Sequence, residues 1–501
     1  MIRPMDVVLR STGDRSLPRV VTADGVLDDR MLAARIDALV AWLAKGGIRR
    51  VASRLDNGPS WFVLDLALRE VGGVHVPLPM FFSDAQVRHA LASSGAQCVV
   101  TAREDVMPPG AEALTGFLDG ERLACWRTLA DDTGAATLPA GTACITYTSG
   151  TTGRPRGVCL DADTLFTVAA SLVDAAASIA PRRHLCLMPL ATLLENVAGL
   201  YATLLADAEI ALPSLSEIGY TGATGLDVPT LLRCLRRYQP ESVILVPQLL
   251  LALVMAAEQG APPPASLRYI AVGGGRVGPG LLQRARALGL PVFEGYGLTE
   301  CGSVVCLNRP EARLEGSVGR PLPHARVSIV DGEIRVDGAR ALAYLGGEPL
   351  PEGPVRTGDL GYQDDEGYVH ITGRRKNVFI TAFGRNVSPE WVESELLAHP
   401  AIGQAVVWGE GQADNVAVLV PRRADIDDAR LARALADVNA GLPDYARVAR
   451  FVRAGAPFTA DAGLMTANGR PRREAILGRY QAEVDACYQR PPNVSPSGVA
   501  A

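Results

Sequence analysis

The residues best suited to chemistry form one stretch, Tyr147-Thr-Ser-Gly-Thr-Thr-Gly-Arg-Pro-Arg-Gly157. Its eleven residues hold three glycines, five hydroxyl groups and two arginines. Glycines let backbone N–H groups approach an anion closely, and hydroxyl and guanidinium groups donate hydrogen bonds to phosphate oxygens. The stretch indicates a phosphate site, although an ordinary surface loop can have the same composition. It is not a Walker A loop, because the spacing Gly-x4-Gly-Lys-Ser/Thr cannot be placed on it.

Two further segments combine carboxylates with hydroxyls and glycines. Glu294-Gly-Tyr-Gly-Leu-Thr-Glu300 ends in an acid, and a carboxylate is a hard oxygen ligand that suits Mg²⁺. Taken alone, Glu300 would be interpreted as an ordinary surface acid. Thr357-Gly-Asp359 offers a carboxylate that only accepts hydrogen bonds, which suits a cis-diol.

The elements around these segments predict an α/β fold. Apolar residues at 143–146 predict a strand before the loop, and residues 163–177 predict a helix after it. Strands that alternate with helices indicate βαβ units and parallel sheet. We predict helices at 28–44, 61–71, 84–93, 193–206, 227–239 and 279–287, and strands at 51–55, 74–78, 97–101, 185–190, 242–246, 267–272 and 291–293.

Composition and charge exclude several classes of protein. A chain of 501 residues with 48% hydrophobic and 21% charged residues is typical of a globular protein with two or more domains. A net charge of −5 suggests no nucleic-acid surface. Nine scattered cysteines indicate reduced thiols in a cytoplasm rather than disulfides or a zinc site. The most apolar run, residues 242–257, is too short to span a bilayer, so we expect no integral membrane segment.

Residues 147–157 resemble, almost letter for letter, the phosphate loop of the adenylate-forming superfamily. This superfamily contains acyl-CoA and aryl-CoA ligases, luciferases and peptide-synthetase adenylation domains. Its usual pattern is Tyr-Thr-Ser-Gly-Thr-Thr-Gly-x-Pro-Lys-Gly, and Arg156 stands in place of the lysine. Only Lys45 and Lys376 among the 49 basic residues are lysines, so the change also fits a general bias to arginine. The resemblance spans nearly the whole chain and is closest to fatty acyl-CoA ligases.

The resemblance implies roles for the residues of the later motifs. Tyr296 is expected to flank the adenine opposite Gly274 and Gly275, and Thr299 to donate to the phosphates. Glu300 is the implied Mg²⁺ ligand. The implied ATP- and AMP-binding residues are Thr148, Ser149, Gly150, Thr151, Thr152, Gly153, Arg156, Gly274, Gly275, Glu294, Gly295, Tyr296, Gly297, Thr299, Asp359 and Arg374. Among them, Asp359 would accept hydrogen bonds from both ribose hydroxyls and Arg374 would contact the nucleotide.

The implied acyl pocket consists of Thr192, Val246, Gly273 and Gly297. Relatives often carry Leu-Pro-Leu-x-His where this chain has Met188-Pro-Leu-Ala-Thr192. Either Thr192 merely packs, or its small side chain leaves the acid more room and a less polar wall.

The resemblance also implies two domains. We expect a large N-terminal domain at 1–375, made of βαβ-layered subdomains and a β-rich section. A small mobile α+β domain would occupy 376–489, and a disordered tail 490–501. Lys376 is the expected hinge residue, and the alternative is a solvated basic turn. Ser388 is the expected N-cap of a helix that begins at Pro389.

Arg470 stands where the family has a catalytic lysine that reaches the α-phosphate and the carboxylate. Arginine is planar and permanently charged, whereas lysine is a mobile point charge. Three interpretations follow: Arg470 acts as the cation, Arg472 or Arg473 substitutes for it in part, or adenylation is slow or lost.

The resemblance implies an ATP-dependent, AMP-forming ligase with Mg²⁺ as its metal and catalytic residues Arg470, Thr299, Glu300 and Lys376. Its expected partners are a small carboxylic acid, expected to be a fatty acid, and coenzyme A. Two alternatives stay open. The acceptor could be the phosphopantetheine arm of an acyl carrier protein, or the chain could be a weak nucleotide- or acyl-binding homologue, because Arg156 and Arg470 replace both lysines.

Overall fold

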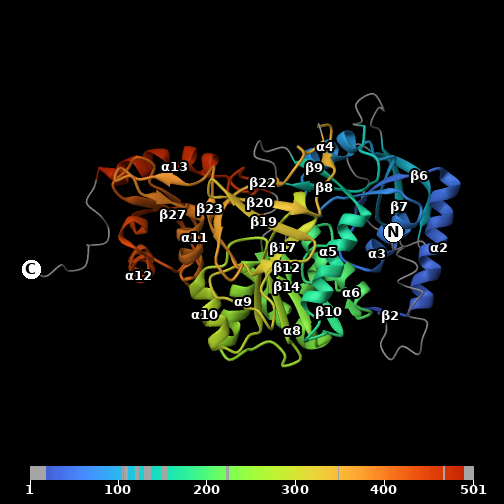
Figure 1. Cartoon of the computed structure of the whole chain (residues 1–501), viewed down its shortest axis with the longest axis horizontal. Coiled ribbons are helices and arrows are strands. Elements are labelled where there is room, and N and C mark those ends of the chain that lie inside the picture. The colour runs from blue at the N-terminus through green and yellow to red at the C-terminus, as the bar shows by residue number, and fades with distance from the viewer. Residues whose placement is uncertain are drawn as a thin grey trace, which may run out of the picture. The chain divides into compact units, whose positions relative to one another are not determined.

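The computed structural model describes residues 19–103, 105, 111–118, 123–128, 137–148, 155–221, 225–347, 349–466 and 469–489 (Figure 1). The predicted tail at 490–501 lies outside this part of the chain. Contacts divide the chain into two units. One takes in the chain up to Gly274 with Leu290–Ser328 and Arg335–Arg356, and the other takes in Gly275–Gly289, Ile329–Ile334 and the chain from Thr357. The predicted boundary at residues 375 and 376 stays a prediction.

The first unit contains two mixed sheets. One has the order β18-β17-β16-β15-β14-β10-β11-β1-β2, and its strands run parallel from β16 to β1. Its strands are β1 (Val20–Thr22), β2 (Gly25–Leu27), β10 (Arg183–Leu185), β11 (Glu209–Ala211), β14 (Ser242–Leu245), β15 (Tyr269–Val272), β16 (Val292–Leu298), β17 (Ser303–Leu307) and β18 (Arg320–Pro321).

The other sheet has the order β21-β9-β8-β4-β3-β5-β7-β6 and is parallel from β8 to β5. Its strands are β3 (Arg50–Arg54), β4 (Val74–Pro77), β5 (Cys98–Ala102), β6 (Ala111–Leu118), β7 (Leu123–Thr128), β8 (Thr142–Thr148), β9 (Arg156–Asp161) and β21 (Ala343–Tyr344). The parallel strands alternate with helices in sequence, as predicted. The helices of this unit include α2 (Asp29–Gly46), α3 (Pro59–Glu70), α4 (Asp84–Ser94), α5 (Ala162–Ala175), α7 (Leu215–Ile218), α8 (Val228–Tyr238) and α9 (Pro247–Glu258).

Helices α2 and α3 share one apolar core with both sheets. Helix α2 begins after Asp28, whose carboxylate accepts a hydrogen bond from the Met31 N–H, and ends at Gly47 with a left-handed φ of 63°. Its buried face packs in one cluster with Val20 of the first sheet and Val51 of the second. One apolar core therefore joins the two sheets.

A polar network is buried within this unit. The Asp65 carboxylate lies 3.1 Å from Arg69 Nη2 and 2.7 Å from His75 Nδ1, and it accepts a hydrogen bond from the Tyr201 hydroxyl. His75 Nε2 lies 2.8 Å from Ser53 Oγ. The order Ser–His–Asp has the geometry of a catalytic triad, but these three side chains are at most 1% exposed. The network is therefore structural.

Two predicted elements around residue 190 differ in the structure. The strand predicted at 185–190 ends at Leu185, because the Met188 N–H donates to Glu195 Oε2 at 2.8 Å. The helix predicted at 193–206 is the π-helix η2 (Glu195–Tyr201) followed by α6 (Ala202–Leu205). A Cβ atom at Gly199 would lie 2.0 Å from Glu195 Oε1, so the glycine provides the room that this buried carboxylate occupies.

In the second unit, helices cover both faces of a three-stranded sheet, β26-β27-β28. Val407 packs with α11 and α12, whereas its neighbour Val406 packs with α13, because successive strand residues face opposite sides. Figure 1 shows α13 and α12 on opposite sides of β27. The elements are α10 (Pro279–Ala287), α11 (Pro389–Ala398), α12 (Asp428–Ala440), α13 (Arg473–Tyr488), β26 (Ile402–Trp408), β27 (Asn415–Pro421) and β28 (Val448–Arg453).

Smaller sheets complete the fold. A four-stranded sheet has the order β19-β20-β22-β23, and the pairs β12-β13 and β24-β25 stand alone. Their strands are β12 (Tyr220–Thr221), β13 (Gly225–Leu226), β19 (Ala325–Val330), β20 (Glu333–Gly338), β22 (Val355–Gln363), β23 (Val369–Arg374), β24 (Phe379–Ile380) and β25 (Asn386–Val387). Ser388 stands at the N-cap of α11 as predicted, although its hydroxyl donates to Glu390 rather than capping the helix.

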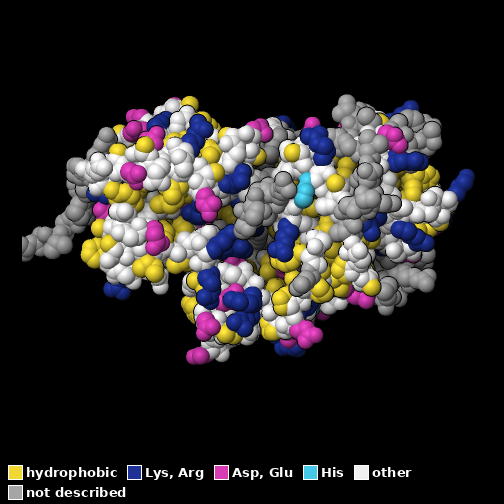
Figure 2. Space-filling model, turned by 90° about the horizontal axis from the view of Figure 1, so that it is seen from above, with side chains coloured by type: hydrophobic (Ala, Val, Ile, Leu, Met, Phe, Trp, Pro, Cys, Tyr) yellow, Lys and Arg dark blue, Asp and Glu magenta, His cyan; other side chains and the backbone are white. Residues whose placement is uncertain are grey.

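Three surface and sequence features bear on the predicted class of protein. All nine cysteines are free thiols, as predicted. Among the described helices, none is long and apolar enough to cross a membrane. Figure 2 shows basic and acidic side chains interspersed over the face that it presents.

Candidate active site

The two ends of the phosphate loop are held by the hairpin of β8 and β9. Thr148 pairs with Arg156, and its hydroxyl donates to the Arg156 carbonyl at 3.3 Å. Tyr147 is buried, and its hydroxyl donates to the Ala90 carbonyl in α4 at 3.0 Å. Predicted loop residues Ser149, Gly150, Thr151, Thr152 and Gly153 lie outside the described residues.

Arg156, the predicted phosphate cation, lies against an aromatic ring. Its guanidinium carbon is 3.3 Å from the centroid of the Tyr344 ring, and the Arg156 side chain is otherwise exposed. Tyr344 in turn donates its hydroxyl to Glu300 Oε1 at 2.8 Å. The predicted phosphate cation and the predicted metal ligand therefore share one tyrosine.

The acidic segment that carries Glu300 turns sharply after β16. Gly297 is required there, because a Cβ atom would lie 1.8 Å from the Ser303 carbonyl oxygen of β17. Thr299 and Glu300 follow in a 3-10 turn, Thr299–Cys301. Within the described residues, the second oxygen of Glu300 accepts no hydrogen bond, so the carboxylate keeps an oxygen for a cation. A half-buried acid of this kind fits Mg²⁺.

The glycine turn predicted to lie against the adenine meets the segment that carries Tyr296. Strands β15 and β16 pair in parallel, with Val272 opposite Glu294. A Cβ atom at Gly273 would lie 3.3 Å from the Gly295 carbonyl oxygen, so the two backbones approach closely. Gly274 has a left-handed φ of 75°. The structure places Gly273 beside the Glu294-Gly-Tyr-Gly segment.

The predicted acyl-pocket residues are brought together in part. A Cβ atom at Gly274 would lie 3.5 Å from Val246 Cγ1 and 3.7 Å from Leu194 Cδ2. Thr192 donates its hydroxyl to the Pro189 carbonyl within its own turn at 2.6 Å. This hydrogen bond is local and is compatible with both alternatives for Thr192. Leu194, two residues further on, is the residue of this segment that lies by the glycine turn.

A buried group of possible metal ligands lies below this segment. Ligand atoms of His184, Cys186 and Glu195 lie within 4.8 Å of one another. The ring nitrogens of His184 and the carboxylate of Glu195 already have hydrogen-bond partners in the protein. His184 lies 3.0 Å from both Glu195 Oε1 and Ser242 Oγ, and Glu195 also accepts a hydrogen bond from the Met188 N–H. Burial raises the pKa of the Cys186 thiol, which favours its neutral form. The group acts as a structural brace.

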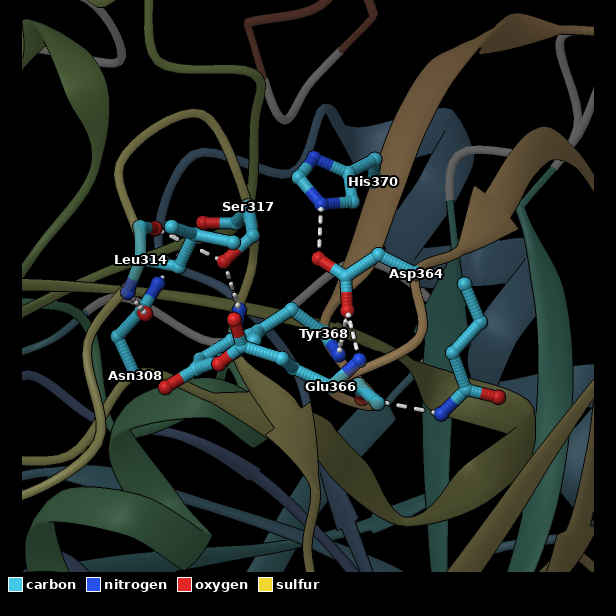
Figure 3. A network of polar contacts seen from close by, with 10 residues as sticks. Asn308, Leu314, Ser317, Asp364, Glu366, Tyr368 and His370 are labelled. Carbon is cyan, nitrogen blue, oxygen red and sulfur yellow. Dashed lines mark hydrogen bonds and ion pairs between the residues drawn. The ribbon is translucent and has the colours of Figure 1, made fainter.

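In the second unit, one hairpin brings Asp359 and Arg374 together. They are opposite each other on β22 and β23, and Arg374 Nε lies 2.8 Å from Asp359 Oδ1. Asp359 is 4% exposed. Asp364 closes the hairpin by accepting the N–H groups of Glu366 and Tyr368 and contacting His370 at 3.0 Å (Figure 3). The predicted nucleotide-binding pair therefore lies on a well-braced strand pair.

Lys376 lies in an exposed turn directly after β23. The N–H groups of Asn377 and Val378 both donate to the Arg374 carbonyl, at 2.9 and 3.0 Å. Asn377 donates its side-chain amide to Glu390 at the start of α11. A turn between two braced elements is a place where a change of backbone angles can act as a hinge.

Arg470 lies in an exposed turn before α13. Its N–H donates to the Thr466 hydroxyl at 3.0 Å, and its carbonyl accepts from the Thr466 N–H. Arg473 is engaged elsewhere, because its guanidinium binds the buried carboxylate of Glu393. Arg473 is therefore poorly placed to act as a substitute cation.

Comparison with known proteins decides the family. A model of the AMP-binding enzyme family matches residues 26–347, and a model of the AMP-binding enzyme C-terminal domain matches residues 376–491. The chain belongs to this family of AMP-binding enzymes. A long-chain-fatty-acid–CoA ligase of Mycobacterium bovis is 27% identical to this AMP-binding enzyme over 535 aligned residues, with 86% of each chain covered.

Solved structures share the fold of this AMP-binding enzyme. An anthranilate CoA ligase in complex with anthranoyl-AMP has a TM-score of 0.79 at 18% identity, with 97% of this chain and 98% of that chain covered. O-succinylbenzoate CoA synthetase of Bacillus subtilis, in complex with ATP and a magnesium ion, has a TM-score of 0.71 at 23% identity, with 94% and 98% covered.

These findings confirm the predicted superfamily, the α/β fold with a large N-terminal and a small C-terminal domain, and the predicted enzyme class, an acid–thiol ligase. The roles of the individual site residues stay predictions. Tyr344 was not predicted as a site residue from the sequence. An aromatic residue in the short apolar segment 341–345 is a weak signal, because nothing in its type or spacing points to the phosphate loop.

Proposed function

We propose that this AMP-binding enzyme activates a carboxylic acid with ATP and transfers the acyl group to coenzyme A. In the first half-reaction an acid oxygen attacks the α-phosphorus of ATP, which forms acyl-AMP and releases pyrophosphate. In the second, the thiol sulfur attacks the acyl carbon, AMP leaves and a thioester forms. The observation that carries the proposal is the link from Arg156 through Tyr344 to Glu300, which joins a cation for phosphate to an acid for Mg²⁺.

Catalysis in this scheme rests on positioning and on neutralising phosphate charge. Arg156 and the loop hydroxyls would hold the outer phosphates, and Arg470 would approach the α-phosphate. Glu300 would hold Mg²⁺, which offsets phosphate charge when bound. Asp359 would accept the ribose hydroxyls. We propose that rotation about Lys376 separates the two half-reactions.

We propose a fatty acid as the substrate class and coenzyme A as the acceptor. Support comes from the long-chain-fatty-acid–CoA ligase, which is similar along most of its length. The nine free thiols support a cytoplasmic location. A carrier-protein phosphopantetheine arm is the alternative acceptor, and a weak binding homologue is the alternative to an active ligase.

A product assay tests the proposal. Purified protein is incubated with Mg·ATP, a panel of fatty and aryl acids, and either coenzyme A or phosphopantetheinylated carrier protein. We expect AMP and an acyl-CoA thioester with at least one fatty acid. Thioester formation only on the carrier protein would mean that the carrier protein, and not coenzyme A, is the acceptor. ATP binding without any product would favour the binding homologue.

A further inference from the structure

Tyr344 lies between Arg156, the proposed phosphate cation, and Glu300, the proposed Mg²⁺ ligand. The Arg156 guanidinium covers one face of its ring, and the Tyr344 hydroxyl donates to Glu300. We propose that Tyr344 is a positioning residue that holds Arg156 and the Glu300 carboxylate at a fixed separation for Mg·ATP. This inference rests on the proposed function, since it assigns Tyr344 to the phosphate and metal end of that site.

The backbone places Tyr344 there independently of its side-chain contacts. Strand β21 joins the edge of β9, with Tyr344 opposite Val158 and Ala343 opposite Cys159. Arg156 lies two residues before Val158, so it points to the same side of the sheet and is the diagonal neighbour of Tyr344. The Leu345 N–H also donates to the Gly157 carbonyl at 2.9 Å. The segment is thereby fixed to the strand that leaves the phosphate loop.

The same segment is also attached to the acidic turn. The Ala341 N–H donates to the Glu300 carbonyl at 2.8 Å, while the Leu342 N–H donates to the Cys159 carbonyl at 2.9 Å. Residues 341–345 therefore bond both to β9 and to the turn that carries Glu300. A change at this segment would alter the distance between the two charges even where neither charged residue is changed.

The chemistry of each contact explains the residue types. A guanidinium is planar and stacks on an aromatic face, whereas an ammonium does so less well, so Tyr344 suits the arginine that replaces the family lysine. A hydroxyl that donates to one carboxylate oxygen fixes the carboxylate plane. The other oxygen then faces a defined direction, which favours a cation that demands strict octahedral geometry, such as Mg²⁺.

The test separates the two contacts with substitutions at one position. Tyr344→Phe keeps the ring and removes the hydroxyl, and Tyr344→Leu removes both. Binding of Mn²⁺ in the presence of ATP is followed by the electron paramagnetic resonance of free Mn²⁺, and AMP binding without metal by calorimetry. We expect Tyr344→Phe to weaken Mn²⁺ binding about three- to tenfold and to change AMP affinity less than about twofold.

A double-mutant cycle tests the stacking contact. We expect Arg156→Lys to weaken Mn²⁺·ATP binding about threefold in the wild-type background and to have no effect beside Tyr344→Leu. Tyr445→Phe, which changes an exposed tyrosine, is the matched control and should bind as wild type does.

The outcomes are distinct. Equal Mn²⁺ affinity of wild type and Tyr344→Phe, or additive effects in the cycle, overturns the role of Tyr344 while leaving the proposed function in place. If wild-type protein binds neither Mn²⁺·ATP nor AMP, the proposed function fails and the inference fails with it. If Tyr344→Leu does not fold, the Tyr344→Phe comparison alone decides, because the isosteric ring keeps the packing.

Discussion

Arg374 Nε lies 2.8 Å from the buried Oδ1 atom of Asp359, across the hairpin of β22 and β23. The carboxylate is thus oriented by a cation on its own sheet. A ribose diol would approach a carboxylate that is already positioned, which lowers the entropy lost on binding.

Asp359→Asn is expected to weaken ATP binding by about ten- to a hundredfold, because it removes the charged acceptor and leaves Arg374 without its partner. Calorimetric titration with ATP measures the change. Asp365→Asn, in the exposed turn of the same hairpin, serves as control and should bind ATP normally. An Asp359→Asn protein with wild-type affinity would exclude Asp359 from the ribose site.

Much of the fold was predictable because local patterns and tertiary structure agree. Helix α2 has apolar residues at helical spacing, an aspartate N-cap and a C-terminal glycine, and the structure has all three. The strand predicted at residues 185–190 was wrong beyond Leu185. There the Met188 N–H donates to the buried carboxylate of Glu195 instead of to a neighbouring strand. A single side-chain hydrogen bond of this kind leaves no trace in hydrophobic periodicity.

The site was predictable where a motif is contiguous. The Glu294-Gly-Tyr-Gly segment lies beside Gly273, so two contiguous motifs meet at the ends of neighbouring strands. Tyr344 was not predictable, because it reaches Arg156 and Glu300 only through strand pairing between segments far apart in the sequence. The hydroxyl of Thr192 donates within its own turn, and the predicted place of Thr192 in the acyl pocket stays a prediction.

Lys376→Pro is expected to spare acyl-AMP formation and to block thioester formation. Proline fixes φ, yet the two hydrogen bonds of this turn come from Asn377 and Val378 and remain possible. Single-turnover assays measure pyrophosphate and thioester separately. Lys376→Ala keeps the backbone free and should support both steps. Equal loss of both half-reactions in Lys376→Pro would argue against a hinge.

Arg470→Ala is expected to slow pyrophosphate release about a hundred- to a thousandfold, since one positioned cation on the transferring phosphate is lost. Arg470→Lys should retain most of the rate. Arg479→Ala, which removes an exposed arginine in α13, is the control. An unchanged adenylation rate in Arg470→Ala would mean that another residue supplies the cation at the α-phosphate.

Asp65→Asn is expected to destabilise the protein by about 3–5 kcal/mol, because it leaves the buried Arg69 without its charged partner. Urea unfolding followed by fluorescence measures the loss. The exposed Asp24→Asn should leave the midpoint unchanged. A shift as small as that of the control would mean that the buried network contributes little.

The same network predicts how stability depends on pH. Burial raises the pKa of Asp65, but Arg69, His75 and Tyr201 outweigh it and bring the pKa to about 2. An unfolded aspartate titrates near 3.9, so Asp65 stabilises the fold above that pH by roughly 2–3 kcal/mol, and this is lost as the pH falls from about 4 to about 2. The penalty of Asp65→Asn should therefore shrink between pH 5 and pH 3. A penalty that stays constant over that range would contradict the assignment.

Acid-dependent exchange of labelled pyrophosphate into ATP tests most directly whether this enzyme adenylates an acid, because exchange requires reversible formation of acyl-AMP and needs no thiol. We expect exchange with at least one fatty acid, dependence on Mg²⁺, and a large loss in Arg470→Ala. A folded wild-type protein that binds ATP but shows no exchange with any acid of a broad fatty and aryl panel would contradict it.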